Sequence, residues 1–188
     1  MAIQQTRPLV VAFVGGDSGM WRVERIESVL GAALPAVPRV DVVEGDVAMH
    51  FEAPSSWVLR GVTGDERYVN RLEHDSLVAR QEPLGRQAST QAALIPIKKS
   101  DQWWQLPRDT RRDIFEESSH HIAIGLEYLP AIARRLHHGR DLGEPFDFLT
   151  WFEFAPADES AFDELVRRLR GTEEWKYVER EVDIRLAR

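Results

Sequence analysis

The chain has 188 residues, 43% of them apolar, and a formal net charge of −7. A length near that of one typical domain and an ordinary apolar share predict a single compact fold and exclude a disordered chain. The chain has no cysteine, which excludes disulfide scaffolds, cysteine-ligated metal sites and thiol catalysis. Because the charge balance is acidic, we expect binding neither to nucleic acid nor to an anionic membrane.

The first half of the chain alternates apolar runs with turn residues. Pro8–Gly16 is an apolar run that ends in two glycines, a pattern that predicts a strand. Behind the helix-capping residues Asp17 and Ser18, apolar residues recur at short steps as far as Leu34, and they predict a helix. Further on we expect strands over 40–51 and 55–62 and a helix over 65–81.

The second half gives clearer patterns. An apolar segment over 92–97 predicts a strand, and mixed aromatic and charged residues over 101–117 predict short helices. Residues 118–138 carry apolar side chains at steps of three and four, as in a buried helical stripe, and Pro130 in its middle predicts a kink or a break. The remaining expected elements are a strand over 146–154, a helix from its cap Asp158 to Leu169, and a strand over 176–186.

Strands and helices therefore interleave through the whole chain. From residue 92 onward the order strand, helices, strand, helix, strand fits a ferredoxin-like α+β unit. The earlier part repeats a similar order, so we expect two packed ferredoxin-like halves, an architecture of the dimeric α+β barrel type. The halves comprise about 1–90, which is shortened, and about 91–188, and together they form one domain over 1–188.

The N-terminus gives an expectation about location. Residues 1–8 lack the basic start and long apolar run of a secretory signal, and no stretch approaches the ~20 apolar residues of a membrane span. We therefore expect a soluble, cytoplasmic protein. A leader removed during processing would instead allow a periplasmic location.

Four of the six histidines occur in two adjacent pairs, His120–His121 and His137–His138. Adjacent side chains on a helix point about 100° apart, so such a pair rarely binds one metal ion. The pattern therefore favours ordinary packing roles over a zinc site. A single histidine that binds a cofactor iron needs no partner at a fixed spacing, and a spacing rule cannot detect it.

The segment around these histidines is locally basic, with three arginines and a single acid over 119–140. On an unbroken helix Arg134 would lie roughly 20 Å from His121, at about 1.5 Å per residue, but a bend at Pro130 can bring the two closer. Large apolar side chains flank the segment and can either wall a cavity or pack in the core. They are Trp103, Trp104, Leu129, Phe146, Phe148 and Trp151.

Long motifs cover the same region. They read SHHIAIGLEYLPAIARRL, then RDLGEPFDFLTWFEFAP and TEEWKYVEREVDIRL, with AALIPIKKSDQWW and RYVNRLE upstream. In these motifs the chain closely resembles the chlorite dismutases, from about Trp57 to the C-terminus. The part that begins FVGGDSGMW resembles the short-subunit, dimeric branch of that family rather than the longer, pentameric one.

The resemblance implies a noncovalently bound haem b, which fits a chain without cysteine. It implies that His121 is the axial ligand of the haem iron, that Glu174 is the carboxylate partner of its imidazole, and that Arg134 is the distal arginine. A carboxylate that accepts the second ring N–H makes the ligand more basic and fixes its orientation. The other matching positions are Lys99 and Tyr68 at the haem propionates, Trp103 in the pocket, and Gln81, Leu129 and Phe148 on the distal side.

The reaction that the resemblance implies is the conversion of chlorite to chloride and dioxygen by a homodimer. The balance of ClO2⁻ against Cl⁻ and O2 involves no proton, so a distal pocket with an arginine and no acid–base group is sufficient. As a hypothesis, chlorite transfers an oxygen atom to ferric iron and leaves a ferryl species and hypochlorite. Arg134, which keeps its charge at any relevant pH, then retains hypochlorite until the O–O bond forms.

Two alternatives stay open at the level of sequence. A coprohaem decarboxylase shares the fold and the proximal histidine, but it lacks the distal arginine and works through a tyrosine. The match at Arg134 argues against it, and the available tyrosines are Tyr68, Tyr128 and Tyr177. The second alternative is a haem-binding sensor or storage module of the same fold, without turnover.

Sulfur-containing side chains are absent from most of the chain. The methionines are Met1, Met20 and Met49, and there is no cysteine. Oxidants attack methionine and cysteine more readily than other side chains. We therefore expect this depletion to protect a pocket in which hypochlorite forms.

Overall fold

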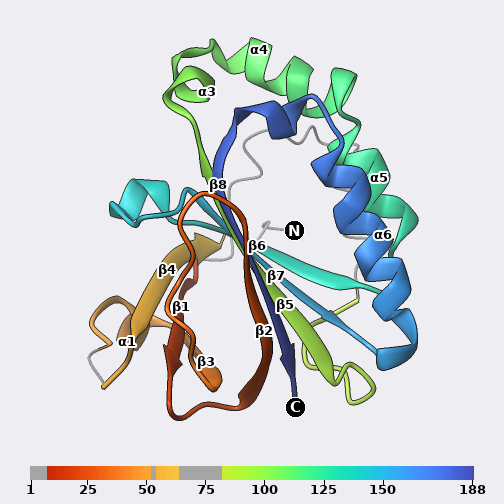
Figure 1. The fold of residues 1–188 in the computed structure, drawn as a ribbon. Coiled ribbons are helices and arrows are strands. Elements are labelled where there is room, and N and C mark those ends of the chain that lie inside the picture. Colours follow the sequence, from red (N-terminus) through yellow and green to blue (C-terminus); the bar gives the residue numbers. More distant parts are fainter. Residues whose placement is uncertain (1–7, 52–53, 64–81) are drawn as a thin grey trace, which may run out of the picture.

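The computed structural model describes residues 8–51, 54–63 and 82–188 (Figure 1). In this part of the chain eight antiparallel strands close into a barrel in the order β1-β3-β2-β8-β5-β7-β6-β4. The strands are β1 (Val10–Gly16), β2 (Trp21–Leu30), β3 (Arg39–Glu44), β4 (Trp57–Thr63), β5 (Gln91–Lys99), β6 (Ala133–His138), β7 (Phe148–Phe154) and β8 (Val178–Ala187). The α-helices are α1 (Asp46–Met49), α3 (Asp101–Gln105), α4 (Arg108–Arg112), α5 (His121–Glu127) and α6 (Glu159–Arg170).

The two halves of the sheet repeat one strand order. In the C-terminal half the order is β8-β5-β7-β6, with α3, α4 and α5 between β5 and β6 and with α6 between β7 and β8. This is the ferredoxin-like βαββαβ arrangement. The N-terminal half has the equivalent order β4-β1-β3-β2, and α1 is the one α-helix among its described residues. The predicted ferredoxin-like α+β fold is confirmed.

The core has two main parts on opposite faces of the sheet. One fills the barrel, with Phe13, Trp21 and Trp151 among its members. The other lies between the sheet and α6, where Phe152 and Phe154 pack against Phe162. Figure 1 shows α5 and α6 side by side along this second face, with α3 and α4 beyond one end of the strands. The helices therefore cover the C-terminal half of the sheet, where the predicted site residues lie.

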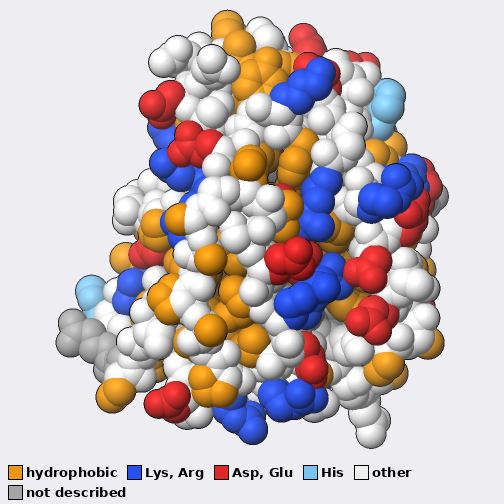
Figure 2. All heavy atoms as spheres, in the orientation of Figure 1, with side chains coloured by type: hydrophobic (Ala, Val, Ile, Leu, Met, Phe, Trp, Pro, Cys, Tyr) orange, Lys and Arg blue, Asp and Glu red, His pale blue; other side chains and the backbone are white. Residues whose placement is uncertain are grey.

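The outer surface reflects this arrangement. Figure 2 shows Lys, Arg, Asp and Glu side chains interspersed on the side of α6, and hydrophobic side chains gathered at the lower left, over β1 to β3. Within the part of the chain that the structure describes, no helix is long and apolar enough to cross a membrane.

The predicted helix behind the first strand is wrong, because these residues form β2 instead. β2 pairs with β8 along most of its length, and the register shifts between Val23 and Arg25. Such a bulge inserts one extra residue into the alternation of a strand. As a result Trp21, Val23 and Ile26 all contact the barrel core, a spacing that resembles a helical period.

The helical stripe over 118–138 breaks near Pro130, as predicted, but its second part is a strand rather than a helix. α5 ends at Glu127, and β6 pairs with β7 over six residues. The steps of three and four continue across the break by coincidence, since Leu136 at the end of the stripe is 42% exposed. This segment is a strand because it pairs with another strand of the sheet. A prediction from a local sequence window does not include that partner.

The other elements agree with the sequence more closely. The strands predicted over 8–16, 55–62, 92–97, 146–154 and 176–186, the short helices over 101–117 and the helix behind Asp158 are all present, with ends shifted by a few residues. The strand predicted over 40–51 ends at Glu44, and α1 follows it. The helix predicted over 65–81 lies outside the described residues.

Candidate functional site

His121, the first residue of α5, lies where the chain turns sharply into the helix. The preceding residue, His120, has a left-handed backbone with φ of 52°, a conformation that residues other than glycine rarely adopt. The His120 carbonyl accepts the Ile124 N–H at 2.8 Å, and the Glu116 carboxylate accepts the Ile122 N–H at 2.8 Å. These contacts satisfy amide groups of the first helical turn and hold His121 in place.

The imidazole of His121 is hydrogen-bonded to a buried carboxylate. Its Nδ1 lies 2.8 Å from Glu174 Oε2, and Lys99 Nζ donates to Glu174 Oε1 at 2.7 Å. The side chains of Lys99 and Glu174 are 2% and 6% exposed, whereas that of His121 is 19% exposed. Because a carboxylate only accepts hydrogen bonds, Nδ1 carries a proton, and in the neutral imidazole Nε2 then keeps its lone pair. His121 therefore presents a nitrogen that can bind a metal.

Glu174 remains ionised in this buried position. Burial by itself raises the pKa of its carboxyl group, but the charge of Lys99 and the hydrogen bonds from Lys99 and His121 hold that pKa below its usual range. An ionised carboxylate is a strong acceptor for the ring N–H. The protonation state of Glu174 therefore fixes both the tautomer and the orientation of the His121 imidazole.

The environment of this carboxylate comes from several separate elements. Glu174 begins a 3₁₀ turn (Glu174–Tyr177) between α6 and β8, and its N–H donates to Ser119 Oγ at 2.9 Å. The Lys99 ammonium at the end of β5 lies 4.7 Å from the ring centroid of Trp103 and 5.6 Å from that of Trp175. Three segments far apart in the sequence thus enclose the pair of charges.

Arg134 is brought close to α5 by the turn that follows this helix. It lies on β6, half-buried, and its Nη1 is 3.3 Å from the place that a Cβ on Gly125 would occupy. Gly125 is buried in α5, one helical turn after His121. The missing side chain of Gly125 therefore leaves the space in which the guanidinium lies. Arg134 on β6 therefore lies against α5, the helix that begins with His121, although a continuous helix would have kept the two residues apart.

The remaining predicted site residues are placed as follows. Trp103 is buried on α3 against Tyr177 and the Lys99 ammonium. Phe148 is half-buried on β7 and stacks on Trp104, and Leu129 is half-buried in the turn after α5. Tyr68 and Gln81 lie outside the described residues, so nothing is shown of their predicted roles.

Lys99 makes contacts that the sequence analysis did not predict. We expected it at a haem propionate, but its ammonium is buried and donates to the carboxylate of Glu174 and, at 3.3 Å, to the Glu174 carbonyl. The physical reason is charge compensation, because a buried carboxylate needs a nearby cation. Lys99 thus belongs with the histidine–carboxylate pair, and its predicted contact with a haem propionate stays a prediction.

Sequence reasoning missed several contributors to the site. Phe115 stacks on the His121 imidazole with ring centroids 4.4 Å apart. Ser119 accepts the Glu174 N–H, and Trp175 borders the Lys99 ammonium. These residues have no distinctive spacing. Trp175 is the exception in one respect, because it directly follows Glu174 in the quoted motif TEEW, and that position could have pointed to it.

Comparison with known proteins identifies the family. The model of the chlorite dismutase family matches residues 48–188 of this chain. The chain belongs to the chlorite dismutase family. A chlorite dismutase from Ideonella dechloratans is 35% identical over 86 residues, which is 46% of this chain and 28% of the length of that relative. The matched stretch thus spans less than a third of that protein.

Solved chlorite dismutases have the same fold. The dimeric chlorite dismutase from Nitrobacter winogradskyi is 53% identical, with a TM-score of 0.88 over 95% of this chain and 99% of that chain. A substituted chlorite dismutase from Candidatus Nitrospira defluvii is 19% identical, with a TM-score of 0.69 over 97% of this chain and 92% of that chain. At that lower identity the likeness concerns the fold alone.

The residues of this chain fit a haem of the kind that the chlorite dismutase resemblance implies. His121 offers Nε2 as an iron ligand, since Glu174 occupies Nδ1. Apolar side chains from α5 and from the sheet, among them Ile124, Tyr128 and Phe148, are half-buried beside the second core cluster. Such a surface can accept the apolar faces of a porphyrin.

Proposed function

We propose that this protein is a haem b-dependent chlorite dismutase that converts chlorite to chloride and dioxygen. The observation that carries the proposal is the hydrogen bond between His121 and the buried carboxylate of Glu174, in a chain that belongs to this family. A ring nitrogen free for a metal and a second nitrogen held by an ionised carboxylate are what an axial histidine ligand needs.

When bound, the haem supplies an iron centre that exchanges an oxygen atom with chlorite. The side chains of the protein bind and orient the haem and the substrate. Glu174 holds the proton of the imidazole on Nδ1, which makes Nε2 more basic and favours oxidised iron. Lys99 keeps the carboxylate ionised and buried. Neither residue has to exchange a proton during the reaction, because the overall reaction releases and consumes none.

Arg134 is proposed as the residue that binds the anionic substrate. Its guanidinium is permanently charged and can donate two parallel hydrogen bonds to an oxyanion. The whole chain carries a net charge of −7, so attraction of chlorite depends on a local positive charge. We therefore expect Arg134 to contribute to substrate binding and to retention of the oxyanion intermediate.

We further propose that the protein is a homodimer. The support is the likeness to a structure described as dimeric, which covers nearly all of both chains. Light scattering on the purified protein should give twice the chain mass of 21.6 kDa. A mass equal to one chain, at concentrations used for activity, would contradict the homodimer.

The function is tested by adding chlorite to the haem-loaded protein and measuring dioxygen with an electrode. We expect a Soret band on haem addition and one dioxygen for each chlorite consumed. A protein that removes propionate carboxyl groups from coprohaem without forming dioxygen would support the decarboxylase alternative. Haem binding without either reaction would support the sensor or storage alternative.

Arg134→Ala tests the substrate-binding role. Loss of hydrogen bonds to a charged group costs about 1.5 kcal/mol or more, so KM for chlorite should rise about 10-fold or more. The variant should also release less dioxygen in total before it is inactivated. Arg134→Lys keeps the charge but not the paired donors, so its KM and its dioxygen yield should lie between those of the wild type and of Arg134→Ala. An unchanged KM and an unchanged dioxygen yield in Arg134→Ala would contradict this role.

A further inference from the structure

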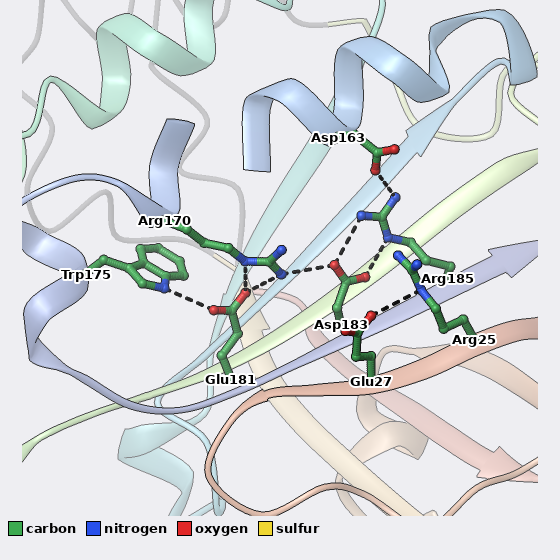
Figure 3. Close-up of polar contacts among 8 residues, drawn as sticks. All are labelled: Arg25, Glu27, Asp163, Arg170, Trp175, Glu181, Asp183 and Arg185. Atoms are coloured by element: carbon green, nitrogen blue, oxygen red, sulfur yellow. Dashed lines mark hydrogen bonds and ion pairs between the residues drawn. The ribbon is translucent and has the colours of Figure 1, made fainter. Parts of the chain in front are cut away.

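A second group of buried charges lies directly beyond the loop that carries Glu174 (Figure 3). Glu181 on β8 is fully buried, and Asp183 on the same face is 1% exposed. Arg170, the last residue of α6, donates to Glu181 Oε1 through Nε (2.8 Å) and Nη2 (2.6 Å), and its Nη2 also donates to Asp183 at 3.0 Å. Arg185 in turn pairs with Asp183 and with Asp163 of α6. These residues form a continuous network between α6 and β8.

The network reaches the candidate site through one residue. Trp175 Nε1 donates to Glu181 Oε2 at 3.0 Å, and Figure 3 shows the indole and Arg170 meeting on the same carboxylate. Arg170 and Trp175 stand at the start and near the end of the loop over 171–177. Glu181 therefore ties both ends of this loop to the sheet, and Glu174 lies between those two anchors.

Stability of the fold does not by itself explain these charges. Burial of the two carboxylates, with part of two guanidinium groups, is costly, and apolar side chains of similar size are often as stable. What charged groups add is geometric specificity, because each hydrogen bond requires one orientation. Both oxygens of Glu181 are used by donors from the loop or its boundary, so the position of the loop is fixed in more than one direction.

We propose that Glu181 and Trp175 are positioning residues that hold the loop over 171–177 so that Glu174 faces Nδ1 of His121. The same indole ring borders the Lys99 ammonium at 5.6 Å, so its placement also bears on the cation that Glu174 accepts a hydrogen bond from. The consequence for a bound haem rests on the proposed function. The consequence for the loop is independent of the proposed function, because it concerns contacts within this chain.

The chain offers a matched pair of variants for the test. Trp175→Phe keeps an aromatic ring but removes the N–H that Glu181 accepts. Trp151→Phe removes the same kind of contact inside the barrel, where Trp151 Nε1 donates to the buried Glu153 at 2.9 Å. Both variants lose one indole hydrogen bond to a buried glutamate, and only the first loses an anchor of the Glu174 loop.

The first readout is hydrogen exchange at the Glu174 amide in the protein without added haem. Loss of one hydrogen bond, worth about 1 kcal/mol, should accelerate this local exchange about 5-fold in Trp175→Phe and leave it unchanged in Trp151→Phe. Glu181→Gln, which removes the charge that holds Arg170, should also accelerate hydrogen exchange at the Glu174 amide. Equal acceleration in both tryptophan variants, or none in Trp175→Phe and Glu181→Gln, would overturn the proposal.

The second readout is the reduction potential of the haem-loaded protein. A less well-oriented Glu174 makes the imidazole less basic, so the potential should rise in Trp175→Phe and stay at the wild-type value in Trp151→Phe. An unchanged potential in Trp175→Phe would overturn the positioning role at the iron. If the wild-type protein bound no haem, the proposed function would fail, and the exchange measurement would still decide the role of the loop anchors.

Discussion

At the scale of single residues, His137 shows how a buried histidine differs from a ligand. It lies in the wall of the barrel, its Nδ1 donates to the Leu149 carbonyl at 3.0 Å, and its ring meets the edge of Phe13. Burial, together with the nearby charges of Arg135 and His138, lowers the pKa of its imidazole to about 4, against the opposing effect of the Leu149 carbonyl. His137 is therefore a neutral part of the core.

This assignment predicts a pH dependence of stability. The folded ring becomes protonated only below about pH 4, whereas the unfolded ring is protonated below about pH 6.5. Between these values the unfolded chain therefore binds the proton more tightly, and protonation favours unfolding. Between pH 8 and pH 5 the contribution of His137 to the free energy of unfolding should fall by about 2 kcal/mol. Urea unfolding at the two pH values should show this loss in the wild type and not in His137→Gln. An equal loss in both proteins would contradict the assignment.

At the scale of elements, the start of α5 decides where the candidate ligand lies. The helix begins directly after the left-handed residue His120, and the side chain of His120 is exposed. The backbone conformation, rather than contacts of its imidazole, is thus what this position supplies. It turns the chain from the π-helical segment Asp113–Ser118 into α5 so that His121 meets Glu174.

Two substitutions of His120 separate these contributions. His120→Gly should leave the free energy of unfolding no lower than in the wild type, because glycine adopts positive φ readily. His120→Val should lower it by about 1–2 kcal/mol, since a β-branched residue is strained in the left-handed region. Urea unfolding checks both values. A stable valine variant together with a destabilised glycine variant would show that the side chain matters and the backbone does not.

At the scale of the whole molecule, the distribution of sulfur matches the proposed chemistry. The sequence after Met49, which includes every proposed site residue, contains neither methionine nor cysteine. Met20 and Met49 are exposed on the N-terminal half. An oxidising chlorine oxyanion that escapes from the site therefore meets few readily oxidised side chains nearby.

Leu129→Met tests this protective effect. A thioether beside the proposed pocket should be oxidised to the sulfoxide during turnover, and the variant should form less dioxygen in total before inactivation. Val29→Met, on β2 of the N-terminal half, is the control and should resemble the wild type. Mass spectrometry of the reacted proteins locates the sulfoxide. Equal dioxygen yields for both variants and the wild type would contradict protection by sulfur depletion.

Features that depend on local pattern and composition could be predicted from the sequence. Continuous apolar runs placed β1, β5 and β7, and the residues around Asp158 placed α6, because burial and capping act within a few residues. The absence of cysteine limited the cofactors that the chain can hold. Long motifs pointed to the chlorite dismutases, and through them to His121, Glu174 and Arg134.

Features that depend on residues distant in sequence became visible in the folded chain. The strand identity of β2 and β6 comes from pairing with β8 and β7, against a local spacing that resembled a helix. Lys99 contacts Glu174 across 75 residues of chain, and Trp175 contacts the charge network of β8. Such contacts leave no periodic trace, because the energy of a buried charge depends on which groups surround it in space. Only the closed sheet brings those groups together.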